Sequence, residues 1–229
     1  EWSNAVTVSG LNTGLYATLY GLVSLCGLLI FVTRLPSGLG IIILLSSGMY
    51  AVVGVLVLLA GYRLDLAGVL FARIEQLVVG VPRIGSRLAG IVRKLPSFTE
   101  DSATLFRNLV SRPEVILPYA IAWAGTLAVF PGARIAVLLS VLGGSFTPVW
   151  LLPVVLVMAY SVTVLPLTPG GIGVAEASAT LVLVSLGVSQ ELAVAVVLVD
   201  RVFGVYLPAL LGAVPMADLD ITTLLSDEQ

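Results

Sequence analysis

The chain has 229 residues, of which 59% are hydrophobic and only 10% charged, with a mean hydropathy of +1.11 and a formal charge of −2. Because soluble domains carry charge on about a quarter of their residues, this composition excludes a soluble globular protein and predicts an all-α polytopic membrane bundle of about six or seven hydrophobic segments. The sequence has no histidine and one cysteine, Cys26, which excludes histidine-based metal sites, histidine-dependent catalysis and an intramolecular disulfide.

Two uncharged spans open the chain. We expect the first to cover residues 11–32 and the second residues 39–62, with a short turn at 34–38 between them. Gly10 and Gly14 have the small-xxx-small spacing through which membrane helices approach one another closely. We therefore predict that these two glycines lie at a helix–helix contact.

The segment 63–112 differs from the rest of the chain in its charge. It holds eight of the eleven basic residues against four acidic ones, so its net charge is +4, while the other three basic and nine acidic residues leave −6. By the positive-inside rule we expect this loop in the cytoplasm. Its charge either serves topology alone or also contacts anionic lipid headgroups. Apolar residues at helical spacing predict amphipathic helices at the membrane surface, namely Leu66, Leu70, Ile74, Leu77 and Val78.

Hydrophobic sequence resumes in the segment 113–143, which is interrupted by Pro131, Gly132 and Arg134. Neither half of this segment is long enough to cross a bilayer by itself, since a crossing helix needs about 20 residues. We therefore predict one kinked and tilted span.

The last part of the chain is again hydrophobic. Segment 148–186 forms either two crossings or two re-entrant halves, and a last helix follows over about 191–214. Both alternatives return the chain to the outside before this helix, so we expect the acidic tail 215–229 in the cytoplasm. These segments together predict one membrane domain over residues 1–214, located in the cell membrane.

A helix-breaking run, Val-Leu-Pro-Leu-Thr-Pro-Gly-Gly-Ile-Gly-Val-Ala-Glu, occupies residues 164–176 within this last part. Its prolines remove backbone donors, and its glycines reach backbone angles that other residues avoid. Broken backbone at membrane depth is tolerated only where protein buries it or where it lines a wet cavity. We therefore predict a helix break beside a cavity, made by Pro166, Pro169, Gly170, Gly171 and Gly173.

The order of residues in the run suggests where the next helix begins. Thr168 is a suitable N-cap and Pro169 a suitable first helical residue, which would leave the amides of Gly170, Gly171 and Ile172 as free donors. Free amides at the positive end of a helix dipole suit a phosphate or carboxylate. The alternative is a plain kink at a close helix contact. Helix propensity favours Ala over Gly by about 1 kcal/mol, so a kinked helix could be stabilised by Gly171→Ala.

Three charged residues fall within hydrophobic segments: Glu176, Asp200 and Arg201. Asp200 and Arg201 are adjacent on one helix, so their side chains point in directions about 100° apart. Glu176 and Arg201 are at similar distances from the turn that joins their helices. We expect an interhelical ion pair between these two, or an Arg201 that is shared between Glu176 and a lipid phosphate.

The residues of the break and of the last helix together resemble a known family. The run Pro166 to Glu176, followed by Arg201, Tyr206, Pro208 and Gly212, is similar to the closing segment of the flippase-like transmembrane domain of lysylphosphatidylglycerol synthases. The resemblance extends more weakly over nearly the whole chain. It implies a polytopic domain that binds or moves polar lipids, with re-entrant helices around a central cavity. It also implies that earlier helices with a similar Gly-rich motif precede Glu1.

The expected function follows from these features. No catalytic constellation or cofactor motif is visible, so we expect no enzyme activity, and the resemblance implies that the transferase activity of some relatives belongs to a separate soluble domain. The favoured function is binding and translocation of an anionic or glycosylated lipid, such as a phospholipid or a polyprenyl-phosphate-linked sugar. The alternatives are a non-transporting module that anchors a partner transferase, and a small-solute transporter. Expected partners are membrane lipids and, as a further partner, a second copy of the chain, but not nucleic acid. The expected headgroup site comprises Thr168, Gly170, Gly171, Ile172, Glu176 and Arg201.

Overall fold

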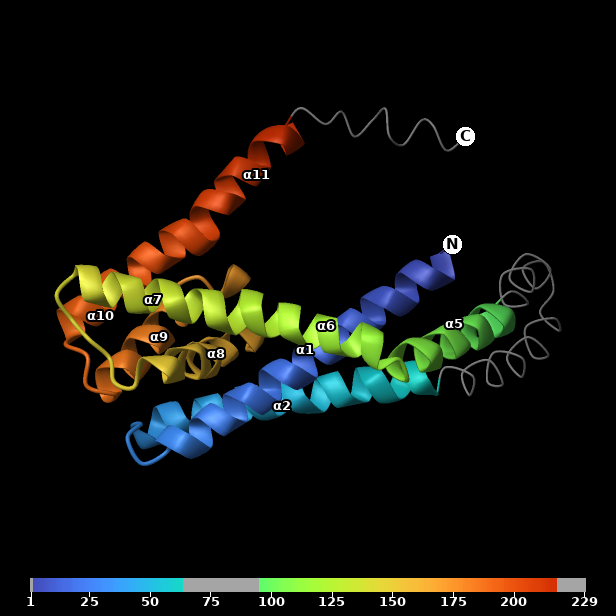
Figure 1. Cartoon of the computed structure of the whole chain (residues 1–229), viewed down its shortest axis with the longest axis horizontal. Coiled ribbons are helices and arrows are strands. Elements are labelled where there is room, and N and C mark those ends of the chain that lie inside the picture. The colour runs from blue at the N-terminus through green and yellow to red at the C-terminus, as the bar shows by residue number, and fades with distance from the viewer. Residues whose placement is uncertain (1, 64–94, 218–229) are drawn as a thin grey trace, which may run out of the picture.

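The structure, a computed structural model, describes residues 2–63 and 95–217 (Figure 1). In these residues all regular secondary structure is helical, which confirms the predicted all-α class. The amphipathic helices predicted around Leu66 to Val78 and most of the acidic tail lie outside the described residues.

Helices α1 (Trp2–Phe31) and α2 (Ser37–Tyr62) form an antiparallel pair, as the two uncharged spans predicted. They approach closely at glycines, because a Cβ on Gly21 would lie 2.5 Å from the backbone nitrogen of Ala51, and one on Gly54 would overlap the backbone of Thr18. The predicted helix contact is confirmed at Gly14, where a Cβ would lie 2.7 Å from Leu58 Cδ2 of α2. It is wrong at Gly10, where a Cβ would meet no described residue within 4 Å. The close packing of the pair therefore begins at Gly14.

The segment 113–141 is one continuous span, as predicted. It consists of α6 (Pro113–Ala124), a π-helical turn η1 (Gly125–Val129) and α7 (Phe130–Val141). Its 29 residues extend about 44 Å at 1.5 Å per residue, more than the hydrocarbon thickness of a bilayer. The π turn lies directly before Pro131, where the lost backbone donor disturbs the regular helix.

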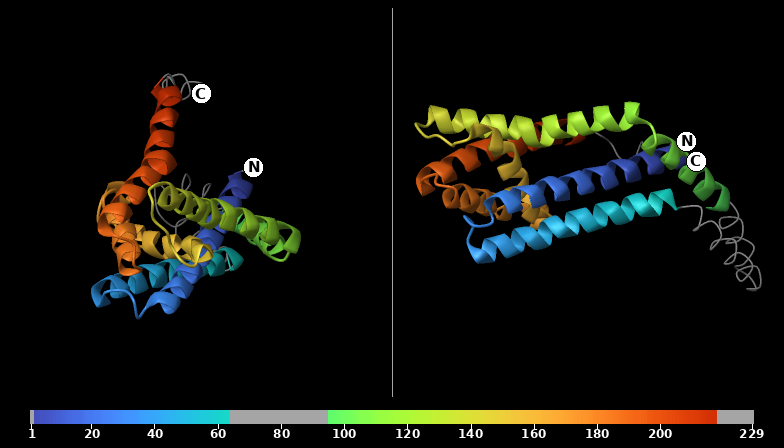
Figure 2. Two further views of the ribbon diagram at one scale, coloured as in Figure 1. Left: turned by 60° about the vertical axis from the view of Figure 1, so that its left-hand side comes forward. Right: turned by 60° about the horizontal axis from the view of Figure 1, so that its bottom comes forward.

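The predicted last helix is confirmed as one span, Gln190–Ala213, and it contains a π-helical turn. Helix α10 (Gln190–Arg201) passes through a π-helical turn η5 (Val202–Tyr206) into α11 (Leu207–Ala217), so Pro215 lies within the helix rather than after it. Helix α11 leans away from the other helices (Figure 1 and the left view of Figure 2). With this span, the described residues contain four helices that are long and apolar enough to cross a membrane.

Two shorter helices lie between the long ones. Helix α8 (Leu152–Tyr160), flanked by the 3-10 turns η2 (Val149–Leu151) and η3 (Ser161–Val164), is buried along most of its length. Helix α9 (Val174–Ser185) has 12 residues, about 18 Å, and is too short to cross a bilayer.

The depth at which the chain reverses between α8 and α9 follows from serine contacts. The hydroxyl of Ser161 lies 3.1 Å from that of Ser46 and 3.4 Å from that of Ser47. Ser46 and Ser47 lie about 14 Å along α2, roughly a third of the way through a helix about 39 Å long. The pair α8–α9 therefore enters the bundle, reverses inside it and leaves at the same end, which corresponds to the re-entrant alternative (Figures 1 and 2).

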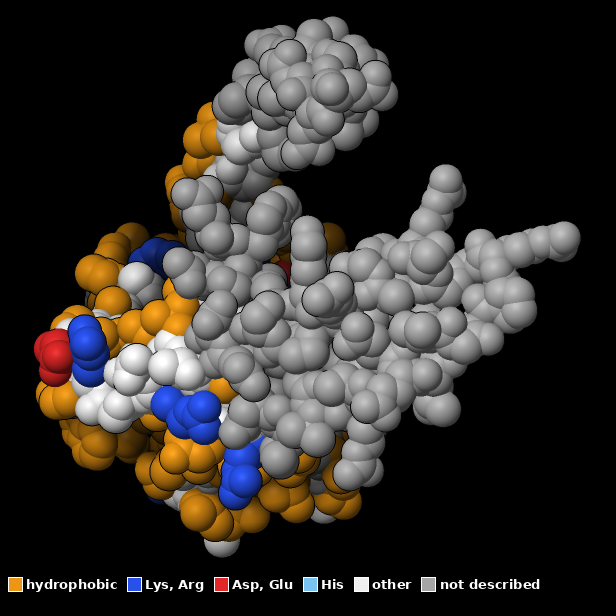
Figure 3. Space-filling model, turned by 90° about the vertical axis from the view of Figure 1, so that its right-hand side faces the viewer, with side chains coloured by type: hydrophobic (Ala, Val, Ile, Leu, Met, Phe, Trp, Pro, Cys, Tyr) orange, Lys and Arg blue, Asp and Glu red, His pale blue; other side chains and the backbone are white. Residues whose placement is uncertain are grey.

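The opposite end of the bundle carries α5 (Leu95–Val110), which packs against α1 and α2. Here Phe106 is buried against Gly61, and the Arg107 guanidinium lies 5.9 Å from the ring centroid of Tyr62. Figure 3 views this end and shows arginine side chains next to apolar surface. The described part of the basic segment thus lies at one end of the bundle, and the re-entrant pair α8–α9 enters from the other end.

Candidate functional site in the re-entrant break

The break differs from the predicted helix start. Residues Pro169–Gly171 form a 3-10 turn, η4, and α9 begins only at Val174, so the expected start at Thr168 or Pro169 is wrong. The reason is backbone geometry. Gly170, Gly171 and Gly173 have φ angles of 66°, 70° and 84°, which a right-handed helix does not allow.

The backbone donors of the break are mostly used within the break itself. The Gly171 amide donates to the Thr168 carbonyl at 3.1 Å, and the Ile172 amide donates to the Pro169 carbonyl at 3.4 Å. The Thr168 hydroxyl donates to the Ile172 carbonyl at 2.8 Å. The predicted row of free amides is therefore wrong: of the three, only Gly170 has no acceptor among the described residues.

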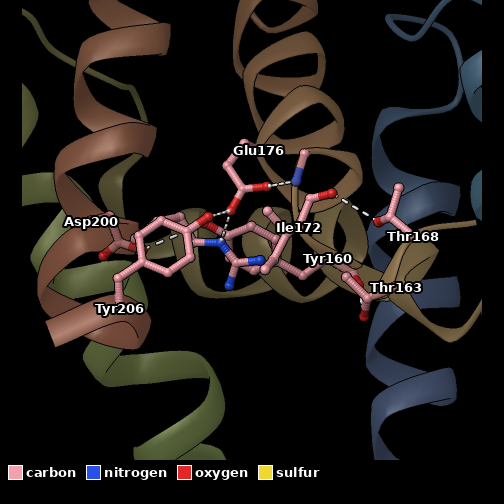
Figure 4. A network of polar contacts seen from close by, with 9 residues as sticks. Tyr160, Thr163, Thr168, Ile172, Glu176, Asp200 and Tyr206 are labelled. Atoms are coloured by element: carbon pink, nitrogen blue, oxygen red, sulfur yellow. Dashed lines mark hydrogen bonds and ion pairs between the residues drawn. The ribbon is translucent and has the colours of Figure 1, made fainter. Parts of the chain in front are cut away.

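The carboxylate of Glu176 accepts hydrogen bonds from three donors (Figure 4). One oxygen accepts the Gly173 amide at 2.6 Å, and the other accepts Arg201 Nε at 2.8 Å and the Tyr206 hydroxyl at 2.7 Å. The predicted ion pair between Glu176 and Arg201 is thus confirmed. We call Gly173, Glu176, Arg201 and Tyr206 the break cluster.

Local sequence explains how Glu176 reaches this position. It is the third residue of α9, and its carboxylate turns back to the amide of the N-cap residue Gly173, which is one half of a capping box. Arg201 and Tyr206 lie at the two ends of the π-helical turn η5, so the turn brings both side chains to one carboxylate oxygen. The site is built where two irregular segments meet.

A second ion pair lies beside the break cluster. Arg134 Nε from α7 contacts Asp200 Oδ1 at 2.7 Å, with 43% of the Arg134 side chain exposed and 2% of that of Asp200. Asp200 and Arg201 therefore point to different partners, as their adjacent positions predicted. Tyr160 lies between the two pairs, with its hydroxyl 3.5 Å from Asp200 Oδ2 and its ring centroid 4.9 Å from the Arg201 guanidinium carbon.

Sequence reasoning missed two participants. In the sequence, Arg134 is interpreted as an interruption of a span rather than as a membrane-depth charge, although a lone arginine well inside a 29-residue hydrophobic span is a signal for a buried partner. Tyr160 carries no such signal, since one tyrosine in an apolar helix is ordinary. Of the predicted site residues, the structure brings Glu176 and Arg201 together. In Figure 4 Thr168 lies on the opposite side of Ile172 from Tyr206.

A comparison with models of protein families matches a part of the chain that includes all residues of the site. The profile described as "Lysylphosphatidylglycerol synthase TM region" matches residues 1–212, a range that includes the break and both ion pairs. No curated protein and no solved structure matches the chain. Because the match covers 212 of 229 residues, the chain belongs to the family of lysylphosphatidylglycerol synthase transmembrane regions and is an integral membrane protein.

Proposed function

We propose that this protein binds the anionic or glycosylated headgroup of a membrane lipid at the break cluster and moves the lipid between leaflets. The observation that carries the proposal is the pairing of Glu176 with Arg201, which lies halfway along the membrane-length span Gln190–Ala213. A charged side chain at this depth costs about 2.5–3.5 kcal/mol on insertion scales, so such residues mark binding sites and transport routes by default.

The contacts suggest how a headgroup would be held. A phosphate oxygen can replace the Glu176 carboxylate on Arg201, because a guanidinium binds carboxylate and phosphate with the same donor geometry. Glu176 would then keep the Gly173 amide and the Tyr206 hydroxyl, so the exchange would not leave a bare carboxylate in the bundle. Arg201 would keep its position over the Tyr160 ring.

The orientation belongs to the same proposal. The basic segment 63–112 and the C-terminus would face the cytoplasm of a cell-membrane protein, by the positive-inside rule. The hairpin of α8 and α9 would then enter from the other side. The proposal assigns no chemical step to this chain, so a transferase reaction would need a partner protein, and a second copy of the chain is a further possible partner.

The test is a leaflet-exchange assay with the full chain in phosphatidylcholine vesicles that contain acyl-labelled fluorescent phosphatidylglycerol. A membrane-impermeant reductant bleaches the outer leaflet, and translocation exposes the inner pool. We expect Glu176→Gln and Arg201→Gln to slow exchange. Glu191→Gln, an exposed carboxylate in the first turn of α10, is the matched control and should exchange like the wild type.

Two outcomes would contradict the proposal. Exchange that is equally fast in all variants means that the break cluster has no part in it. Binding of the labelled lipid without exchange by the wild type would favour the non-transporting anchoring module.

A further inference from the structure

A groove outside the break cluster lies between α7 and the α10–η5 segment. It encloses about 510 Å³, and its walls are apolar. Helix α7 contributes Phe130 and Val137, and the other wall includes Val199 and Phe203. Phe130 and Phe203 are largely exposed, so the groove opens outward toward the surface that would face lipid.

Arg134 is the one charged side chain that is substantially exposed in this groove. Its partner Asp200 also lines the groove, but that side chain is almost completely buried. A guanidinium has five N–H donors, and in the described part of the chain only Nε of Arg134 has an acceptor. The other four donors are available to a ligand.

The guanidinium of Arg134 occupies space beside Gly204 in η5 that a side chain at that position would fill. A Cβ on Gly204 would lie 2.5 Å from Arg134 Nη2. The groove therefore holds a planar donor group against bare backbone, at a depth where hydrocarbon offers no acceptor.

We propose that this groove is a lateral lipid-docking site, in which Arg134 holds the phosphate of an anionic phospholipid while the walls of α7 and α10 hold an acyl chain. The guanidinium and the apolar walls of the groove together identify this occupant. Two guanidinium N–H groups bind a phosphate in a bidentate manner, and apolar walls favour hydrocarbon. A free phosphate lacks the chain, and an uncharged diacylglycerol lacks the phosphate.

The docking site extends the proposed function and rests on it. Asp200, which holds Arg134, is the chain neighbour of Arg201 in the break cluster, and Tyr160 contacts both residues. A lipid docked at the exposed Arg134 is thus next to the more buried Arg201. The two arginines form an outer and an inner headgroup position on one route.

The experiment uses the full chain in detergent micelles with phosphatidylglycerol that carries a photoreactive diazirine in its acyl chain. Irradiation and peptide mapping should label residues of α7 and η5 that line the groove. Unlabelled phosphatidylglycerol should compete for this labelling, whereas glycerol 3-phosphate and diacylglycerol should not. Competition by glycerol 3-phosphate alone would make the site one for a free phosphate and overturn the docking of a lipid.

Variants separate the headgroup contact from the groove. Val137→Trp fills the groove and leaves the ion pair intact, while Val141→Trp, four residues further on α7 and exposed outside the groove, is the matched control. The double variant Arg134→Gln with Asp200→Asn removes the guanidinium without leaving a buried charge. We expect the double variant to reduce labelling about tenfold, as for loss of a charged hydrogen bond. Val137→Trp should also reduce labelling, because the indole occupies the space of the acyl chain, and Val141→Trp should leave it unchanged. Equal labelling in both tryptophan variants would overturn the inference.

Failure of the docking site and failure of the proposed lipid translocation give different combinations of groove labelling and leaflet exchange. Glu176→Gln should keep the groove labelling and slow leaflet exchange. Groove labelling without exchange by the wild type would retain the docking site and reject translocation. Exchange without groove labelling would reject the docking site alone.

Discussion

Glu176 connects the local and the tertiary structure of this protein. Its carboxylate caps the first turn of its own helix through Gly173 and also pairs with Arg201 from another helix. Both side chains of the pair are largely buried, at 11% and 15% exposure. A carboxylate with this many donors is fixed in position before any ligand arrives, which is a requirement for a selective headgroup site.

The pair predicts a specific pattern of stability changes. Glu176→Gln and Arg201→Gln should each lower the free energy of unfolding by about 3–5 kcal/mol, because each leaves an uncompensated buried charge. The double variant should lose less than the sum of the two. Denaturant unfolding in detergent measures all three.

Glu191→Gln combined with Arg201→Gln is the control for this cycle. Glu191 lies about 15 Å from Arg201 along α10, beyond the range of direct coupling, so their effects should add. Additive effects for Glu176 and Arg201 as well would exclude the described contact.

At the scale of elements, the decisive feature is a hairpin that reverses within the bundle. Pro169, Gly170 and Gly171 form the 3-10 turn η4, and α9 starts only after Gly173, whose φ is positive. The π-helical turn η5 lies beside this reversal and supplies two of the donors to Glu176. Irregular backbone in both segments is therefore a condition for the site.

The break predicts a cost for side chains at its glycines. Gly173→Ala should destabilise the protein by about 1–2 kcal/mol, because φ of 84° disfavours any residue with a Cβ. Gly171→Ala should cost more than this, since its Cβ would also lie 3.0 Å from Thr163 Cγ2. This reverses the expectation that Gly171→Ala could stabilise a kinked helix.

Gly212→Ala is the control for the thermal-unfolding measurement. Gly212 lies inside α11, and a Cβ there would meet no atom of residues 2–63 or 95–217 within 4 Å, so helix propensity should make alanine favourable by about 1 kcal/mol. A Gly173→Ala variant that unfolds at the temperature of the Gly212→Ala variant would show that α9 begins differently.

At the scale of the whole molecule, the described residues contain four helices of membrane-crossing length and one re-entrant pair. From these four crossings we expect Trp2, Tyr62, Pro113 and Ala217 to face one side of the membrane. We expect the loop around residues 142–148 on the opposite side, with the base of the re-entrant pair.

Cysteine accessibility in cells tests this arrangement after the exposed Cys26 has been replaced. We expect Ser111→Cys, before the third crossing, and Ser145→Cys, after it, to be labelled from opposite faces. By charge, Ser86→Cys and Ser226→Cys should behave like Ser111→Cys. Labelling of positions 111 and 145 from the same side would exclude the crossing.

The sequence by itself determined the class of the protein, its long spans, its family and the pairing of Glu176 with Arg201. These features depend on composition, on segment length and on the cost of charge in hydrocarbon, which are local or additive properties. Only the tertiary structure decided that Arg134 meets Asp200 and that the hairpin reverses inside the bundle. It also decided that the amides of Gly171 and Ile172 are occupied. The physical reason is that these features depend on the register between helices far apart in the chain, and on glycine backbone angles that several geometries of the same residues allow.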